Sequence, residues 1–320
     1  MTRWQTVGLL TQGQGFPKGT KGIADLGGGV NLAPISTLLS EPGFTEWLRA
    51  SHGHEELDLS DYAFVYEYEA SGLGDPDPDD PKRMKQDAAL ERIQLASIAL
   101  WLSNVIRPSF SAYAHAPLEM EGGVALWYTR RAEPIRPNQF DRHHELDEEA
   151  EQTIREISGS LYALPRPSPL WSAVRFLLFG LREVVGDTRI TLLWIAIEAL
   201  FGTIEPGPET SRELYRRIAG FFETTRKEQL AVHELAKAGW WMRCQAVHGG
   251  RTRDVKPEML LERIVEAERI LRMSFNRILR DPVLLATFGD DATREAFVAT
   301  KSAEFQAQDG MSTRDHGETQ

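Results

Sequence analysis

The sequence predicts a mainly α-helical protein in which a helical bundle follows a small α+β domain. From about residue 146 onward, apolar side chains recur at helical spacing with few interruptions. Before that point the chain is rich in glycine, proline and acidic residues, and it contains two strand-like segments and one helical segment. We therefore expect an α+β domain over 1–145, a helical bundle over 146–285, and a C-terminal helix with a disordered tail over 286–320.

Few elements are recognisable in the N-terminal domain. Residues 61–70 (DYAFVYEYEA) alternate and are rich in aromatic and β-branched side chains, so they predict a strand, and 122–131 (GGVALWYTRR) predict a second. Residues 86–106 have helical periodicity that ends before Pro108. The glycine-rich segment 11–34 predicts a loop or a small irregular unit, because it matches neither phosphate-binding glycine pattern.

Capping residues and prolines divide the C-terminal half into an antiparallel bundle, which we expect to contain five helices. Asp187 is the expected N-cap of one helix and Gly202 its expected end, while Pro257 lies in the first turn of the last helix. Residues 226–248 form a helix that ends before paired glycines. Its expected stripe contains Leu230, Leu235, Ala238, Trp241 and Met242.

Composition limits the cellular setting and the kinds of site. The chain has one cysteine, so no intrachain disulfide can form, and it begins with no signal-peptide pattern. Its apolar runs are too short to span a bilayer, and we expect a cytoplasmic protein with no membrane partner. His143 and His144 are adjacent and point in different directions, so they predict a polar boundary. Because no H-x-x-x-H or C-x-x-C cluster occurs, we expect neither a metal nor a cofactor.

The charge is unevenly distributed. The chain has a formal net charge of −11, of which residues 1–80 contribute −9, with four basic and thirteen acidic side chains. Residues 205–280 contain fifteen Lys or Arg and eleven Asp or Glu, which gives +4. An acidic chain attracts polyanions weakly over long distances, but a basic patch within 205–280 is compatible with binding RNA.

Arg243 and His248 are the candidate functional residues. They lie at the end of the helix 226–248, beside Trp240 and Trp241. A helix C-terminus favours a protonated histidine, and the planar fork of an arginine suits phosphate oxygens. On an ideal helix the two side chains are about 140° apart, so they converge only if the last turn loosens or two copies of the helix meet. The alternative is that both are capping and packing residues.

Glu198 is a lone acid in the apolar segment LLWIAIEALF. An unpaired buried carboxylate is costly, so we expect Glu198 to lie inside the bundle and to meet a cation. Arg243 is the expected partner, and another arginine of the bundle is the alternative.

The segments DTRITLLWIAIEALFG (187–202) and WWMRCQAVHGG (240–250), with the basic helix between them, resemble the Apea-like branch of the HEPN superfamily. The resemblance rests on an E-x-L pattern, here Glu198 to Leu200, and on a later Arg-x4-His-Gly motif, and it covers about 165–280. It implies a helical bundle that often dimerises and a metal-independent ribonuclease in bacterial toxin–antitoxin systems or antiphage defence. It also implies that Arg243 and His248 form the catalytic pair.

Two functions therefore remain open. The favoured one is a homodimeric, metal-independent endoribonuclease that acts on RNA, with Glu198 supporting Arg243 and His248. The alternative is a non-catalytic HEPN module that binds nucleotide, RNA or a protein partner such as an antitoxin. The residue after the motif arginine, often polar in catalytic members, is Cys244 here, and this departure keeps the alternative open.

Overall fold

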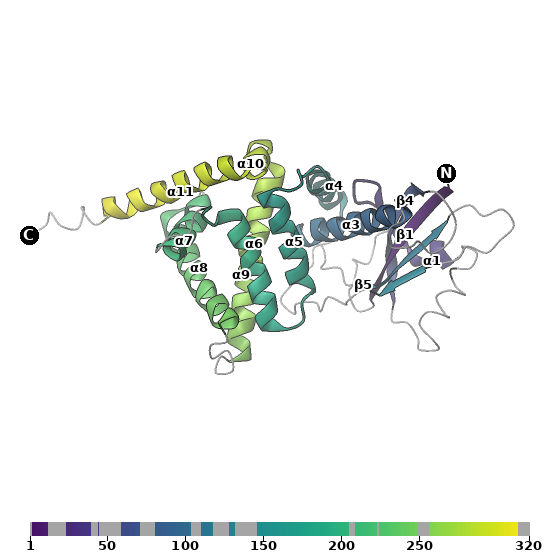
Figure 1. Ribbon diagram of the computed structural model, residues 1–320, viewed down its shortest axis with the longest axis horizontal. Coiled ribbons are helices and arrows are strands. Elements are labelled where there is room, and N and C mark those ends of the chain that lie inside the picture. Colours follow the sequence, from purple (N-terminus) through teal and green to yellow (C-terminus); the bar gives the residue numbers. More distant parts are fainter. Residues whose placement is uncertain are drawn as a thin grey trace, which may run out of the picture. The chain divides into compact units, whose positions relative to one another are not determined.

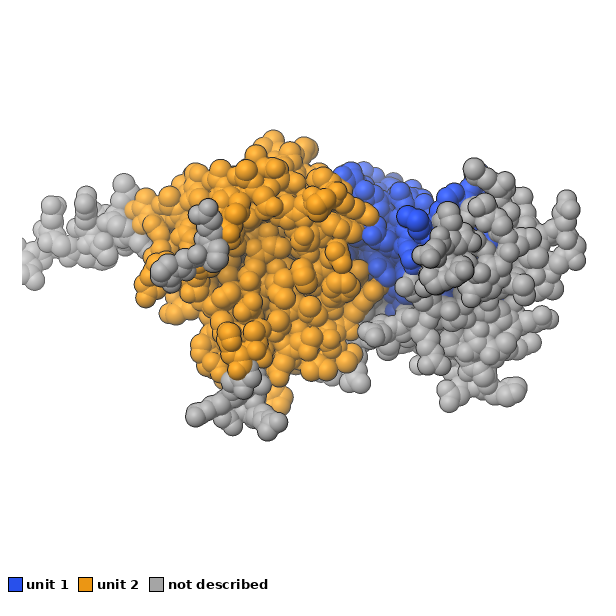
Figure 2. Space-filling view, in the orientation of Figure 1, with its two compact units in different colours: residues 1–163 blue, residues 164–320 orange. Residues whose placement is uncertain are grey.

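The computed structural model describes residues 2–11, 24–39, 44, 59–70, 81–103, 110–117, 128–131, 146–204, 209–222, 224–248 and 256–312. The chain forms two compact units, residues 1–163 (unit 1) and 164–320 (unit 2), which Figure 2 shows in different colours. Unit 1 contains a sheet and unit 2 is helical in its described residues, so the mainly α-helical fold with a small N-terminal α+β part is confirmed (Figure 1).

The sheet of unit 1 has six strands in the order β2-β3-β4-β1-β5-β6, and all neighbours are antiparallel. The strands are β1 (Thr2–Thr11), β2 (Ala24–Asp25), β3 (Val30–Pro34), β4 (Leu59–Ala70), β5 (Phe110–Pro117) and β6 (Tyr128–Arg131). The predicted strand over 61–70 is confirmed as β4, and β6 covers the C-terminal end of the one predicted over 122–131. The sequence pattern did not predict the other four strands.

Both faces of this sheet are covered, which explains why its strands are hard to recognise. On one face α3 (Pro81–Leu102) packs closely, because a Cβ on Gly8 of β1 would lie 3.1 Å from Ile93 of α3. On the other face, Val7 and Leu9 of β1 belong to a buried core cluster. Leu38 of α1 (Ile35–Leu39) belongs to the same cluster. A strand buried on both faces loses the alternation of apolar and polar residues that a half-exposed strand shows.

The end of the glycine-rich segment is a β-hairpin and not an irregular loop. Gly27, Gly28 and Gly29 connect β2 to β3 with φ of 87°, 60° and 83°, a region that favours glycine. The side chain of Tyr162 also occupies the place where a Cβ on Gly28 would lie, at 1.9 Å. The three glycines are therefore required by the turn and by this close approach. Residues 12–23 of the segment lie outside the described residues.

The helix α4 (Glu148–Tyr162) belongs to unit 1, although we expected the bundle to begin at 146. The hydroxyl of Tyr162 donates to the carbonyl of Arg92 in α3 at 3.1 Å, and the guanidinium of Arg92 lies 4.8 Å from the Tyr162 ring. These contacts attach α4 to α3, so the compact units divide after Ala163 and not after residue 145.

Seven helices occur in the described part of unit 2, whereas we expected a bundle of five over 146–285 and a C-terminal helix after it. They are α5 (Pro169–Arg182), α6 (Gly186–Phe201), α7 (Thr210–Phe221), α8 (Arg226–Val247), α9 (Pro257–Arg280), α10 (Pro282–Phe288) and α11 (Asp291–Ser312). Arg217 of α7 is buried and pairs with Glu295 of α11, which ties α11 to the bundle. The C-terminal helix is therefore part of the same unit. Residues 313–320, the predicted tail, lie outside the described residues.

Capping explains most of the helix boundaries. Thr225 and Glu228 form a capping box at the start of α8, and Pro257 begins α9 as predicted. Gly202 ends α6 as predicted, but the N-cap of this helix is Val185, and Asp187 lies in its first turn. There its carboxylate still faces the positive end of the helix dipole. Among the described residues we find no helix with the length and apolar character needed to cross a membrane.

Candidate functional site

The candidate residues depend on a close approach of α6 and α8. A Cβ on Gly239 of α8 would lie 2.6 Å from the ring of Trp194 in α6, so this ring packs directly on the backbone of α8 where that helix has no side chain. The ring of Trp240 lies edge-on to Trp194, with 6.0 Å between centroids. This packing fixes the part of α8 that precedes Arg243.

The predicted partnership of Glu198 with Arg243 is confirmed. Arg243 Nε lies 3.2 Å from Glu198 Oε1, and the two side chains are 19% and 30% exposed. Both atoms are buried, yet they are not aligned for a hydrogen bond and have no other hydrogen-bond partner among the described residues. The guanidinium of Arg243 also lies 4.8 Å from the centre of the Trp240 ring. Charge attraction and stacking therefore orient Arg243 together.

Burial raises the pKa of the Glu198 carboxyl above its ordinary value of 4.5, and the positive charge of Arg243 only partly opposes this rise. The cost of removing the carboxylate from water therefore exceeds the attraction that Arg243 supplies. A carboxylate kept in this position at a net electrostatic cost is a candidate for a functional role.

His248 is the C-cap residue of α8, and its backbone N–H donates to the carbonyl of Cys244 at 3.0 Å. Its side chain is exposed and makes no hydrogen bond or ion pair within the described part of the chain. Arg243, five residues earlier, is not exposed in the same way, because Glu198 and Trp240 hold it half-buried. The structure describes no contact between Arg243 and His248. Gly249 and Gly250 lie outside the described residues.

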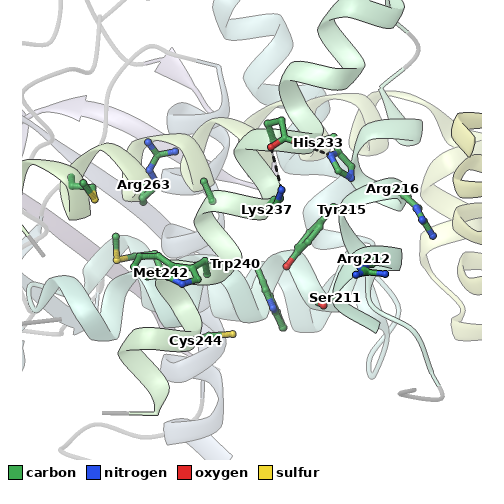
Figure 3. A pocket seen from close by; sticks show the side chains of 14 residues that line it. Ser211, Arg212, Tyr215, Arg216, His233, Lys237, Trp240, Met242, Cys244 and Arg263 are labelled. Carbon is green, nitrogen blue, oxygen red and sulfur yellow. Dashed lines mark hydrogen bonds and ion pairs between the residues drawn. The ribbon is translucent and has the colours of Figure 1, made fainter. Parts of the chain in front are cut away.

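Three helices of unit 2 surround a pocket of about 900 Å³ (Figure 3). Figure 3 shows Arg212 and Arg216 at one flank and Arg263 at the other. Arg243 and His248 are not among the lining residues, although their neighbours Met242 and Cys244 are. The lining residues are Ser211, Arg212, Tyr215 and Arg216 of α7; His233, Glu234, Lys237, Ala238, Trp240, Trp241, Met242 and Cys244 of α8; and Met259 and Arg263 of α9.

Sequence reasoning missed this pocket and wrongly placed two residues of α8 on a common buried stripe. Trp241 is 53% exposed and Leu230 is 43% exposed. The buried positions of α8 are Gln229, Ala236, Gly239 and Met242. Three of these four buried residues are small or polar, while a large aromatic side chain is left at the surface. The excess of basic residues in 205–280 was the one sequence signal for a charged site here.

A second pocket of about 570 Å³ lies within unit 2 and is lined in part by Glu198, Thr203 and Arg294. Glu198 therefore contacts Arg243 on one side and lines this pocket as well. The described residues contain no group of three or more His, Cys, Asp or Glu side chains that could hold a metal ion. His143 and His144 lie outside the described residues.

Comparison with known proteins does not assign a family. No family model matches the chain, and no curated protein or solved structure is detectably similar to it. The functional argument therefore rests on the site itself.

Proposed function

We propose that this chain is a metal-independent endoribonuclease of HEPN type, with Arg243 and His248 as its catalytic pair. The observation that supports the proposal is the ion pair between Glu198 of α6 and Arg243 of α8, five residues before the exposed His248. This ion pair joins segment 187–202 to segment 240–250, the two segments on which the resemblance to HEPN proteins rests.

The orientation of Arg243 suits phosphate binding. Glu198 faces the Nε of Arg243, and the terminal nitrogens of Arg243 make no hydrogen bond within the described residues. These nitrogens are left to stabilise the charge that builds on the phosphoryl oxygens during cleavage. Glu198 acts in this mechanism as a positioning residue, because it contacts the arginine and not the substrate.

His248 supplies the proton transfers in the proposed reaction. As a base it removes the proton of a ribose 2′-OH, which attacks the adjacent phosphorus while the bond to the 5′-oxygen breaks. An acid then protonates the leaving 5′-oxygen, and a cyclic phosphate remains on the other product. One histidine per chain does not readily serve as base and acid in one step, so we propose a homodimer that brings two copies of His248 to one RNA. The proposed setting is the cytoplasm, in toxin–antitoxin or antiphage defence.

The test is RNA cleavage by the purified full-length protein in EDTA. His248→Ala should lower the cleavage rate by about 10²–10⁴-fold, and the products of the wild type should end in cyclic phosphate. Arg243→Lys should not restore full activity, because lysine lacks the planar fork. The exposed His248 can be replaced without unfolding, whereas the half-buried Arg243 requires a matched measurement of stability. Equal cleavage by the wild type and His248→Ala contradicts the proposal.

A second candidate function is a non-catalytic module that binds nucleotide, RNA or a protein partner. The observation that favours it is the large pocket lined by basic and aromatic residues, which includes neither Arg243 nor His248. This function predicts that the wild-type protein binds one of these ligands and leaves RNA intact.

A further inference from the structure

The large pocket of unit 2 presents an unusual aromatic surface. Trp240, Trp241 and Tyr215 line it together, and Trp241 is 53% exposed. Trp194 contacts the Trp240 ring edge-on, and Arg243 lies over it, so the position of Trp240 is fixed. An exposed tryptophan beside a fixed one offers a flat aromatic ligand a place to stack, at little cost in side-chain ordering.

Cations surround this surface. Arg212, Arg216, Lys237 and Arg263 line the pocket, and Glu234 is the one acidic residue among its lining residues. Arg212 and Arg216 are four residues apart on α7 and therefore lie on the same face of that helix. This excess of positive charge contrasts with the net charge of −11 of the whole chain, and the pocket lies within residues 205–280, whose formal charge is +4.

The cations differ in how firmly they are held. Arg212 pairs with Glu209 at 3.2 Å and Lys237 with Glu234 at 3.7 Å, and all four side chains are at least 62% exposed. Exposed pairs contribute little free energy, so a phosphate can displace these carboxylates. Arg263 is only 19% exposed and pairs with both Glu262 and Glu266. Arg212 and Lys237 are thus the more available cations.

We infer that this pocket binds a nucleotide, with the base stacked on Trp241, beside Trp240, and the phosphate at Arg212 and Lys237. Its volume of about 900 Å³ lies within the range of ligand pockets, about 300–1,000 Å³. Stacking on aromatic rings combined with cationic contacts to phosphate is the general way in which proteins bind unpaired nucleotides. An acidic peptide would satisfy the cations but would leave the exposed tryptophan without a planar partner.

The pocket adjoins the candidate catalytic pair through Trp240, which lines it and also contacts Arg243. Trp241 precedes His248 by seven residues, about 10 Å along the axis of α8. A nucleotide in the pocket can therefore belong to an RNA strand that continues toward His248, or it can be a free nucleotide. The inference holds for both sources and does not require that the protein cleave RNA.

Cys244 provides a probe of occupancy within the pocket itself. It is the single cysteine of the chain, it is half-buried, and it lines the pocket. The rate at which a thiol reagent modifies Cys244 would be measured in the full-length protein alone and with each probe. The probes are a 2′-O-methyl oligoribonucleotide, which cannot be cleaved at its sugars, AMP, inorganic phosphate and polyglutamate.

We expect the oligoribonucleotide or AMP to slow this modification in a saturable way, while phosphate and polyglutamate at equal concentration do not. If AMP protects Cys244 with a low Kd, the pocket is a free-nucleotide site. If only the oligoribonucleotide protects Cys244, the pocket is a site for an RNA strand. Protection by neither of them, or equal protection by polyglutamate, overturns the inference. Because no probe needs to be cleaved, an inactive protein leaves this result interpretable.

Variants test which residues make the contacts. Trp241→Ala should weaken binding by about 5- to 100-fold, as expected for the loss of one stacked base. For the oligoribonucleotide, Lys237→Glu should reduce the slope of log K against log salt by about 0.7, as expected for the loss of one phosphate contact. Phe179→Ala, an exposed aromatic of α5, and Lys227→Glu, an exposed lysine outside the pocket, are the matched controls. Wild-type affinity in both pocket variants, or equal losses in the controls, overturns the assignment.

Discussion

Glu198 and Glu268 each pair with an arginine of a neighbouring helix, but the two ion pairs differ in burial. Glu268 of α9 and Arg189 of α6 are 5% and 11% exposed, whereas Glu198 and Arg243 are 30% and 19% exposed. Removing one partner of a well-buried pair leaves the other charge uncompensated and typically costs about 3–5 kcal/mol. A more exposed and poorly aligned pair contributes much less.

We therefore predict that Glu268→Gln lowers the free energy of unfolding of unit 2 by about 3 kcal/mol or more. Glu198→Gln should change it by less than about 1 kcal/mol at neutral pH. Urea denaturation of both variants measures the difference. A larger loss in Glu198→Gln would mean that this carboxylate is retained for stability, which would weaken its proposed role beside Arg243.

The raised pKa of Glu198 predicts how this comparison depends on pH. A carboxyl whose pKa is higher in the folded protein binds its proton more tightly there, so its stabilising contribution is complete below the unfolded value of 4.5. That contribution is lost as pH rises through the folded pKa. The wild type should therefore lose stability relative to Glu198→Gln as pH rises above 4.5, in urea titrations between about pH 4 and 8. A relative gain over that window would show that Arg243 outweighs burial.

At the scale of the element, two glycines in helices have opposite surroundings. A Cβ on Gly239 of α8 would lie 2.6 Å from the buried ring of Trp194, whereas a Cβ on Gly159 of α4 would meet nothing within 4 Å. Alanine favours a helix over glycine by about 1 kcal/mol, but overpacking a core costs about 1–3 kcal/mol.

Gly159→Ala should therefore stabilise unit 1 by up to about 1 kcal/mol, and Gly239→Ala should destabilise unit 2 by up to about 2 kcal/mol. Thermal denaturation followed by circular dichroism checks both signs. If Gly239→Ala proved as favourable as Gly159→Ala, the close approach of α6 and α8 would be wrong, and with it the placement of Arg243.

Periodicity predicted helices better than strands, and the reason is physical. The helices of unit 2 have long amphipathic repeats and clear caps, such as Pro257 at the start of α9. The strand β1 has buried side chains on both of its faces, including Gln5 and Thr6, so its sequence does not alternate. Trp241 was misplaced for a related reason, because α8 packs against α6 through Gly239, which contributes no apolar signal.

At the scale of the whole molecule, the parts of the site that could be predicted were those that involve one pair of residues. Glu198 needed a cation, and electrostatics alone favoured a nearby arginine. The pocket joins α7, α8 and α9, so its lining depends on how three helices pack. No spacing in the sequence encodes the distance of Lys237 from Arg212. The acidic first eighty residues also make the net charge of the whole chain negative, so the net charge gives no indication of the positive charge of the pocket.

The proposed shared use of two histidines makes a prediction for the assembled molecule. If each cleavage event needs His248 from both subunits, a dimer with one wild-type and one His248→Ala subunit should be inactive. Unfolding and refolding an equimolar mixture distributes subunits at random, so half of the wild-type subunits are then paired with a variant. RNA cleavage per wild-type subunit should fall to about half of its value in the unmixed protein, whereas mixing with Lys227→Glu, an exposed change far from His248 on α8, should leave it unchanged.

The mass of the mixed species, measured by light scattering, shows whether dimers form. Unchanged cleavage per wild-type subunit in a dimeric mixture would mean that one His248 is sufficient, and a second group in the same subunit would then have to supply the other proton transfer.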